Sequence, residues 1–253
     1  MSVKNNSIES REVYAHRGAS GTYFENTMKA FYGAIDEGAD GIELDVQLSR
    51  DGVFFVIHDE DLTRVSGVHK NISEMNAADI EQIRIGKRFL RGMKGSHIPT
   101  LTSVVSFASI NSIGLNIELK ETVSRNPERL KDLLDQVAIL DNVHISSFDY
   151  SLIRRVWELE PSMETGLLLK KSMLTDNQLS DYPAADAFHF HKRMLKEPYL
   201  PYWKQTDKKI RVYGVDGNEP YVLNPPEFVN GWITDYPSRF RNTSIDLKKK
   251  TRL

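Results

Sequence analysis

Short runs of apolar and β-branched residues recur along the whole chain and are separated by segments with helical spacing of apolar positions. Runs of this length, bounded by polar or turn residues, predict strands. Nine strands are expected: Glu12–Ala15, Gly41–Val46, Val53–Ile57, Leu115–Leu119, Val143–Ile145, Gly166–Leu169, Ala187–Phe190, Ile210–Val215 and Gly231–Thr234. Helices are expected between most of them, among them Asn26–Glu37, Pro127–Ile139 and Ser151–Glu160. This alternation is typical of repeated βα units.

One connection is too short for a parallel crossover. Only six residues separate Val46 from Val53, whereas a crossover needs about a dozen or more. The two strands should therefore form an antiparallel hairpin around Asp51 and Gly52. Removing the hairpin strand leaves eight strands, the number that closes a TIM (β/α)8 barrel. Residues 59–99 are then an insertion after the second strand, with one helical piece at Asn76–Ile85, placed over the active-site face.

Composition supports one globular domain over residues 1–253. The 253 residues are 40% hydrophobic and 27% charged, and a (β/α)8 barrel typically takes about 250 residues. The net charge of −2 argues against a nucleic-acid partner. No apolar run approaches the roughly 18 residues of a membrane span, so we expect no integral membrane association and a cytoplasmic location. Oligomeric state stays open, as does any function of the basic tail Asp246–Leu253.

Carboxylates occupy alternate positions on two predicted strands. Glu43 and Asp45 share one face of the second strand, and Glu118 shares a face with Lys120 on the next parallel strand. Adjacent buried carboxylates are costly unless a cation neutralises them. Three oxygen donors, in a chain without cysteine, favour Mg²⁺ or Ca²⁺ over structural zinc. Internal salt bridges in the barrel are the alternative interpretation.

Two histidines are expected beside these carboxylates. His16 ends the first strand, where barrel enzymes place catalytic groups, and His58 arrives through the hairpin. A histidine pair beside a metal suits a phosphodiester reaction, which needs one proton acceptor and one donor. Arg17 and Lys120 would hold the nonbridging phosphate oxygens. Asn26 is expected to cap the following helix, and Glu25 to pair with a basic group, so both are left out of the catalytic set.

Several motifs resemble those of the glycerophosphodiester phosphodiesterase family. They are His16-Arg17-Gly18, Glu25-Asn26-Thr27, the run Gly38 to Val46, Asp51-Gly52, His58-Asp59, Leu62-Thr63-Arg64, Ile98-Pro99-Thr100-Leu101, Asn116-Ile117-Glu118-Leu119-Lys120, Ser146-Ser147-Phe148 and the run Ile233 to Pro237. They extend over nearly the whole chain in the family's order and spacing. The resemblance implies a PLC-like phosphodiesterase barrel.

The resemblance also implies roles for individual residues. It implies metal ligation by Glu43, Asp45 and Glu118, acid-base roles for His16 and His58, and phosphate contacts from Arg17 and Lys120. One divalent cation, Mg²⁺, Ca²⁺ or Mn²⁺, would be the cofactor. The implied reaction is hydrolysis of a glycerophosphodiester to an alcohol and sn-glycerol 3-phosphate.

Departures from the family pattern lie near the last strands. Tyr213 stands where the family commonly has tryptophan, and we expect it to line the glycerol or head-group pocket. His189 and His191 replace part of another family motif and are expected to line the pocket or to be structural. Glycerophosphocholine and glycerophosphoethanolamine are the leading substrates. Lysophospholipase D-like activity on a single-chain lipid and a catalytically silent phosphodiester-binding barrel are the alternatives.

Overall fold

The computed structural model describes residues 11–87, 89, 95–176 and 179–240. The tail Asp246–Leu253 lies outside the described residues. Eight parallel strands form a closed barrel, because the first strand pairs with both the last and the second. Their order around the barrel follows the chain: β1 Glu12–His16, β2 Gly41–Leu48, β6 Gly114–Leu119, β7 Val143–Ser147, β8 Glu164–Leu169, β9 Ala187–His191, β10 Lys209–Tyr213 and β11 Gly231–Thr234. The predicted TIM barrel is confirmed.

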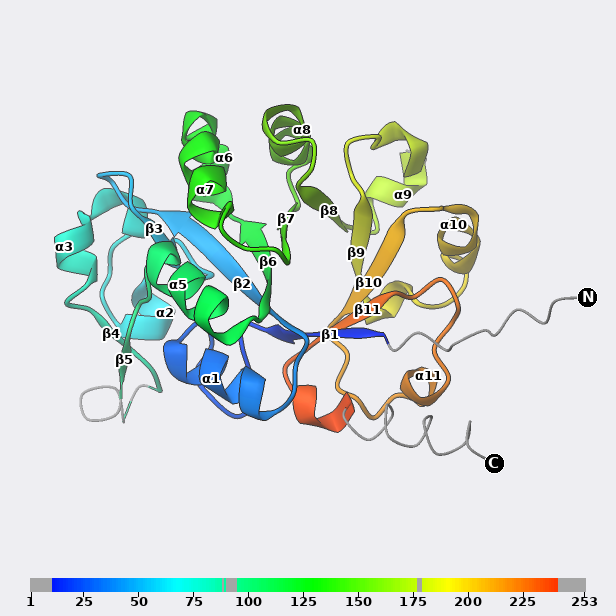
Figure 1. The fold of residues 1–253 in the computed structure, drawn as a ribbon, viewed down its shortest axis with the longest axis horizontal. Coiled ribbons are helices and arrows are strands. Elements are labelled where there is room, and N and C mark those ends of the chain that lie inside the picture. Colours follow the sequence, from blue (N-terminus) through cyan, green and yellow to red (C-terminus); the bar gives the residue numbers. More distant parts are fainter. Residues whose placement is uncertain (1–10, 88, 90–94, 177–178, 241–253) are drawn as a thin grey trace, which may run out of the picture.

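Helices surround the strands, as Figure 1 shows. They are α1 Met28–Asp36, α5 Leu101–Asn111, α6 Glu121–Ser124, α7 Leu130–Val137, α8 Tyr150–Leu159, α9 Met173–Asp176, α10 Leu200–Gln205 and α11 Pro220–Leu223. Short 3₁₀ turns cover Ile72–Glu74, Pro127–Arg129, Leu179–Asp181, Lys192–Met194 and Pro237–Phe240. No helix in the described part of the chain is both long enough and apolar enough to cross a bilayer.

The outer faces of the strands form the apolar layer between barrel and helices. Ile42, Leu44, Ile117 and Leu119 are buried in a cluster that includes residues of α5 and α7. The alternate residues of these strands therefore point into the barrel. This alternation is what directs Glu43, Asp45 and Glu118 inward, although apolar residues surround them in the sequence.

The predicted hairpin is also confirmed. Strand β3, Phe54–Val56, pairs antiparallel with β2, with Val46 opposite Val56. Gly52 at the turn has a φ of 84°, a conformation that glycine adopts without steric cost. The Ile57 amide donates to the Asp45 carbonyl at 2.9 Å, so the hairpin delivers His58 beside the acidic strand.

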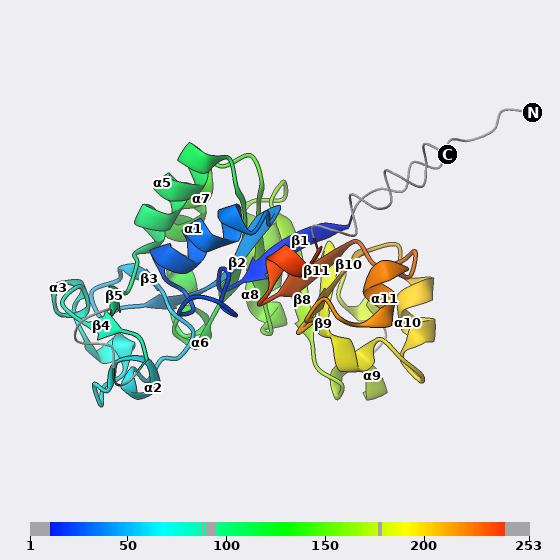
Figure 2. The ribbon, with the colours of Figure 1, turned by 90° about the horizontal axis from the view of Figure 1, so that it is seen from below.

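The insertion has a small core of its own beside the barrel (Figure 2). It contains α2 Thr63–Ser66, α3 Ala77–Ile80 and a two-stranded sheet of β4 Arg84–Ile85 and β5 Ser96–His97. The predicted helix over Asn76–Ile85 is wrong in its second half, because Arg84 and Ile85 pair with His97 and Ser96 instead. That the insertion covers the active-site face stays a prediction, as does the single-domain organisation.

The barrel interior below the site is polar. The guanidinium of Arg211, which is 1% exposed, pairs with Glu12 at 3.1 Å and Glu164 at 2.6 Å. Above it, the ring of His144 packs edge-on against Tyr14 at 5.1 Å and against His189 at 5.7 Å. TIM barrel interiors are usually filled by branched apolar side chains, so this polar interior is distinctive.

Candidate active site

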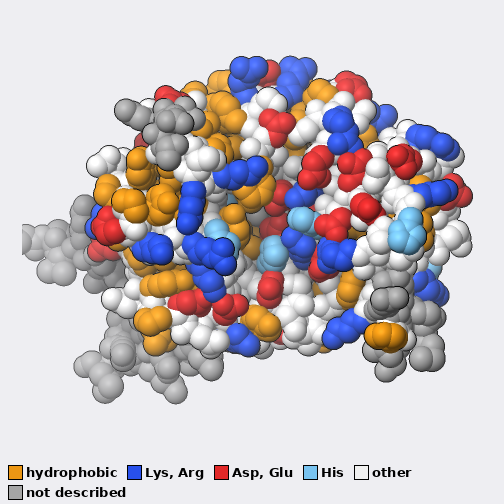
Figure 3. Space-filling view, turned by 180° about the vertical axis from the view of Figure 1, so that it is seen from behind, with side chains coloured by type: hydrophobic (Ala, Val, Ile, Leu, Met, Phe, Trp, Pro, Cys, Tyr) orange, Lys and Arg blue, Asp and Glu red, His pale blue; other side chains and the backbone are white. Residues whose placement is uncertain are grey.

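A pocket of about 350 Å³ opens at the carboxyl ends of the barrel strands. Figure 3 shows this face, where histidine, acidic and basic side chains gather around a central hollow. All eight parallel strands, or the residues that follow them, contribute to the lining: His16, Arg17, Glu43, His58, Asn116, Glu118, Lys120, Ser146, Phe148, Leu168, His189, His191, Tyr213, Gly214, Ile233 and Asp235. The volume suits a small molecule.

Three carboxylates converge beside this pocket, as the sequence predicted. Asp45 on β2 is the register partner of Glu118 on β6, and Glu43 lies two residues before Asp45. Glu43, Asp45 and Glu118 are all buried, and each can present one oxygen so that the three lie within 4.8 Å of one another. One small cation could therefore contact all three.

The electrostatics of the triad favour a cation. Burial and the charge of Asp45 raise the pKa of Glu43 and of Glu118. Burial also opposes ionisation of Asp45, but Arg17 and Lys120 outweigh it and lower the pKa of that carboxyl. Asp45 Oδ1 is buried without a hydrogen-bond partner among the described residues. A buried carboxylate oxygen that accepts no hydrogen bond, within an acidic cluster, fits a hard divalent metal ion.

The ring of His16 is oriented by the carboxylate of Asp235, which directly follows the last strand, β11. Its Nδ1 lies 2.7 Å from Asp235 Oδ1, which also accepts a hydrogen bond from Ser20. Burial lowers the pKa of His16, but the hydrogen bond to Asp235 and the charge of Glu43 outweigh burial, so the pKa is raised. A carboxylate only accepts, so Nδ1 carries the hydrogen and Nε2 is left for the substrate. The side chain is 35% exposed, enough to be reached from the pocket.

His58 is held in the same way. Its Nδ1 lies 2.6 Å from Asp59 Oδ1, and its side chain is 33% exposed. Asp59 in turn accepts from Arg64, a residue of α2 in the insertion. Both predicted catalytic histidines therefore present Nε2 beside the acidic triad, each oriented by an aspartate.

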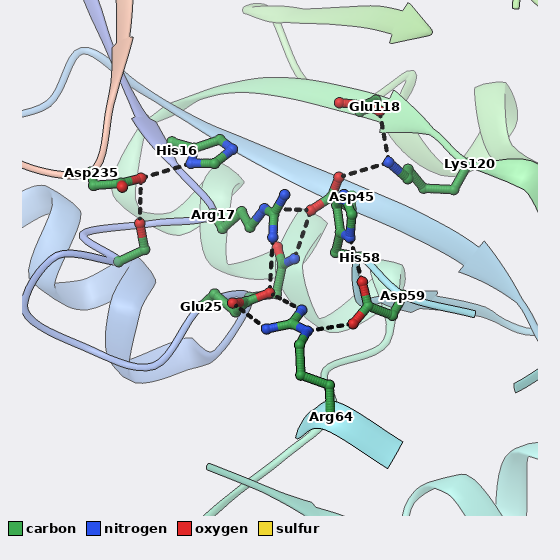
Figure 4. A network of polar contacts seen from close by, with 12 residues as sticks. His16, Arg17, Glu25, Asp45, His58, Asp59, Arg64, Glu118, Lys120 and Asp235 are labelled. Atoms are coloured by element: carbon green, nitrogen blue, oxygen red, sulfur yellow. Dashed lines mark hydrogen bonds and ion pairs between the residues drawn. The ribbon is translucent and has the colours of Figure 1, made fainter. Parts of the chain in front are cut away.

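Arg64 also ties the insertion to Arg17. Its two terminal nitrogens donate to the two oxygens of Glu25, at 2.9 and 2.7 Å. Glu25 accepts from Arg17 at 2.9 Å, and Arg17 Nε lies 3.1 Å from Asp45 Oδ2. Figure 4 follows these contacts from His58 to Asp45. Glu25 pairs with basic groups as predicted, and these groups belong to the site.

The loop after β1 is conformationally strained. Arg17 and Asn26 have φ values of 55° and 52°, which non-glycine residues rarely adopt. The Arg17 amide donates to Glu43 at 3.0 Å, and Asn26 donates to Asp45 at 2.9 Å. The prediction that Asn26 caps α1 is wrong, because Thr27 accepts from the Ala30 amide. Asn26 instead orients a carboxylate of the triad, and strain of this kind concentrates at functional sites.

Lys120 lies where the strand pattern placed it. Its Nζ is 2.9 Å from Glu118 and 3.7 Å from Asp45. The remaining predicted pocket residues are also placed as expected: Tyr213, His189 and His191 line the pocket. His189 is fully buried, and both of its ring nitrogens are without a hydrogen-bond partner among the described residues.

Four residues of the site were missed as functional groups: Asp235, Asp59, Asn26 and Arg64. Each lies in a motif that the family resemblance had already picked out. Sequence spacing could not show that Asp235 reaches His16, because 219 residues separate them. Closure of the barrel between β11 and β1 brings them together.

Asp235→Asn is expected to lower kcat by about 10-fold to 10²-fold, a part of the roughly 10²-fold to 10⁴-fold that general acid-base catalysis supplies. The substitution removes the charge that stabilises protonated His16, so the apparent pKa assigned to His16 should also move to lower pH. A kcat–pH profile measures both effects. Asp141→Asn, at an exposed position away from the pocket, is the matched control. An unchanged profile for Asp235→Asn would remove Asp235 from the site.

The TIM barrel and the acidic, histidine-flanked pocket at the carboxyl ends of its strands identify the protein as a barrel enzyme. Residues 16–239 match the model of the glycerophosphoryl diester phosphodiesterase family. The chain belongs to this family, and is a hydrolase, as the sequence predicted.

Individual relatives agree with the family model. A glycerophosphodiester phosphodiesterase of Bacillus altitudinis is 36% identical, with coverage of 90% of this chain and 96% of the relative. One of Caldanaerobacter subterraneus subsp. tengcongensis is 32% identical, with coverage of 94% and 98%. The structure of a phosphodiesterase of Oleispira antarctica, in complex with the product sn-glycerol-3-phosphate, has the same fold, with a TM-score of 0.80 at 24% identity and coverage of 93% and 96%.

Proposed function

We propose that the protein is a divalent-metal-dependent phosphodiesterase that hydrolyses glycerophosphodiesters to an alcohol and sn-glycerol 3-phosphate. The observation that carries this proposal is the convergence of Glu43, Asp45 and Glu118 between two histidine–aspartate pairs. The names of the relatives that are 32% and 36% identical support the substrate class.

The buried triad fits a divalent cation, and Glu43, Asp45 and Glu118 would hold it. When bound, Mg²⁺, Ca²⁺ or Mn²⁺ would supply positive charge against a nonbridging phosphate oxygen. This charge adds to that of Arg17 and Lys120, which both lie against the triad. Together these positive charges would stabilise the negative charge that develops on the phosphorus oxygens.

His16 and His58 would divide the proton transfers. One ring accepts a proton from the attacking hydroxyl, and the other gives a proton to the departing alkoxide. Each requires a free ring nitrogen facing the substrate and a fixed orientation. Asp235 and Asp59 provide both by engaging Nδ1.

Metal removal tests the proposal directly. With glycerophosphocholine as substrate, release of sn-glycerol 3-phosphate should stop in EDTA and return when Mg²⁺, Ca²⁺ or Mn²⁺ is added in excess. The comparison of the three ions also identifies the preferred metal. Release that continues unchanged in EDTA would contradict the assignment of the triad. No release under any condition would favour a silent phosphodiester-binding barrel.

Activity on single-chain lipids is the alternative substrate assignment. Such a substrate needs an apolar groove next to the pocket, and the insertion was the candidate. Most of its described apolar residues, including Ile72 and Ile80, pack into its own core. Phe89 is exposed, and no described residue of the insertion lines the pocket. The structure therefore favours soluble diesters, and parallel assays with glycerophosphocholine and lysophosphatidylcholine distinguish the two. The cytoplasmic location expected from the sequence stays a prediction.

A further inference from the structure

The acidic side of the pocket faces an uncharged wall across the barrel, and cationic side chains follow the strands of that wall. Strands β2 and β6 carry the acidic triad on one side. In the closed order of eight strands, β9 lies opposite β2, with β8 and β10 as its neighbours. Leu168, His191, Tyr213 and Gly214 line the pocket on this side. Phe148 also lines the pocket and follows β7, the neighbour of β8. We call these five residues the far wall.

Cationic side chains follow the strands of the far wall. Lys170 comes directly after β8, and its Nζ lies 5.1 Å from the centre of the Phe148 ring. Lys171 is next in the chain, and Arg193 follows β9. Lys170, Lys171 and Arg193 form no ion pair within the described part of the chain, and all three are exposed.

Acidic residues nearby cancel only part of this charge. Asp216 and Glu219 both bind Lys192, so of the four positive charges of Lys170, Lys171, Lys192 and Arg193 two stay uncompensated. The pKa of His191 reflects these positive charges. Burial, followed by the charges of Arg193, Lys192 and Lys171, lowers the pKa of its ring. Figure 3 shows basic side chains gathered to the left of the central hollow, on the side away from the insertion.

The placement of Lys170 matters for substrate choice. An aromatic ring at a pocket wall attracts a quaternary ammonium group through its π face. Here the ammonium of Lys170 already lies near the Phe148 ring, so a cationic head group would meet like charge at this position. An anionic group would instead meet Lys170, Lys171 and Arg193. Charge of this kind controls specificity mainly by disfavouring the wrong partner.

We propose that Lys170, Lys171 and Arg193, next to the far wall, select glycerophosphodiesters that carry a second anionic group, a phosphate or a carboxylate, beyond the phosphodiester that is cleaved. The proposal rests on the proposed function and names the substrate class of the same pocket. Lys170 is the residue expected to contribute most to this specificity, because it lies against a lining residue of the pocket. Lys171 and Arg193 add positive charge, but their side chains are not placed against a lining residue of the pocket.

The test compares kcat/KM for three substrates: glycerophosphocholine, glycerophosphoglycerol, and glycerophosphoglycerol with a terminal phosphate on its head group. The wild-type enzyme should prefer the phosphorylated substrate over the choline substrate by roughly 10-fold, and Lys170→Glu should reduce or reverse that preference by about 10-fold. The change should be larger in KM than in kcat, because the contact is present before the reaction. Raising the salt concentration should weaken the preference.

Two variants serve as controls. Lys170→Met keeps an apolar chain of similar length over Phe148 and should lose only the charge preference. Lys29→Glu makes the same charge change at an exposed residue of α1 that does not line the pocket, and should leave the substrate ratio unchanged. Equal kcat/KM values for the three substrates, or a ratio that Lys170→Glu does not alter, would overturn the proposal. Failure to hydrolyse any of the three would overturn the proposed function instead.

Discussion

Replacing His16 or His58 with alanine is expected to lower kcat by about 10²-fold to 10⁴-fold, the range that general acid-base catalysis supplies. Each histidine is oriented by its own aspartate, through contacts of 2.7 Å for His16 and 2.6 Å for His58. Loss of either ring leaves one proton transfer without its group. The proposed metal ligands and phosphate-binding cations are unchanged in both variants, so KM should change much less than kcat.

Steady-state kinetics at saturating metal measure this effect. His69→Ala is the matched control, because His69 is an exposed histidine of the insertion and does not line the pocket. Thermal unfolding of each variant checks that the fold is retained. A correctly folded His58→Ala variant with the wild-type rate would exclude His58 from the mechanism.

The second large effect concerns stability at acidic pH. His144 and His189 are fully buried in the barrel, close to the charge of Arg211. Burial and then Arg211 lower the pKa of both rings well below the ordinary histidine value. The neutral rings are therefore favoured in the folded protein, and protonation is favoured in the unfolded chain, where both rings are in water.

The sign of the pH dependence follows from this difference. Above pH 6.5 the folded and the unfolded protein both bind few protons at these rings, so the contribution of the two rings to the free energy of unfolding is fully present. As the pH falls below 6.5, the unfolded chain takes up protons that the folded protein does not. The slope from the two rings together should grow as the pH falls and approach about 2.7 kcal/mol per pH unit roughly one unit below pH 6.5, until the folded-state pKa values are reached.

Urea unfolding of the metal-free protein at several values between pH 7.5 and 4.5 measures this slope. At the acidic end of this range, His144→Gln and His189→Gln should each make the slope shallower by about 1.4 kcal/mol per pH unit relative to the wild type. Contributions from the acidic triad and from surface carboxylates are common to all variants and cancel in the comparison. His69→Gln, at an exposed position, should leave the slope unchanged. A wild-type slope in both buried variants would show that these rings do not limit acid stability.

Much of the fold follows from local sequence patterns. Alternating apolar positions on strands such as Gly41–Leu48 and Gly114–Leu119 determine which side chains face the barrel. The short link through Gly52 forced an antiparallel hairpin and so predicted that His58 lies near Asp45. Element ends were less predictable, because the capping of α1 by Thr27 rather than Asn26 depends on the loop after β1.

The sequence by itself determined the barrel, the acidic triad and the two histidines, because strand alternation and one hairpin bring these residues together through neighbouring strands. Only the tertiary structure decided which groups orient the histidines. Asp235 reaches His16 through barrel closure, and Arg64 reaches Glu25 and Asp59 because the insertion packs beside the barrel. The placement of Lys170 and Arg193 across the barrel from the triad was likewise decided by the closed strand order, since local periodicity does not specify which strands face each other across a barrel.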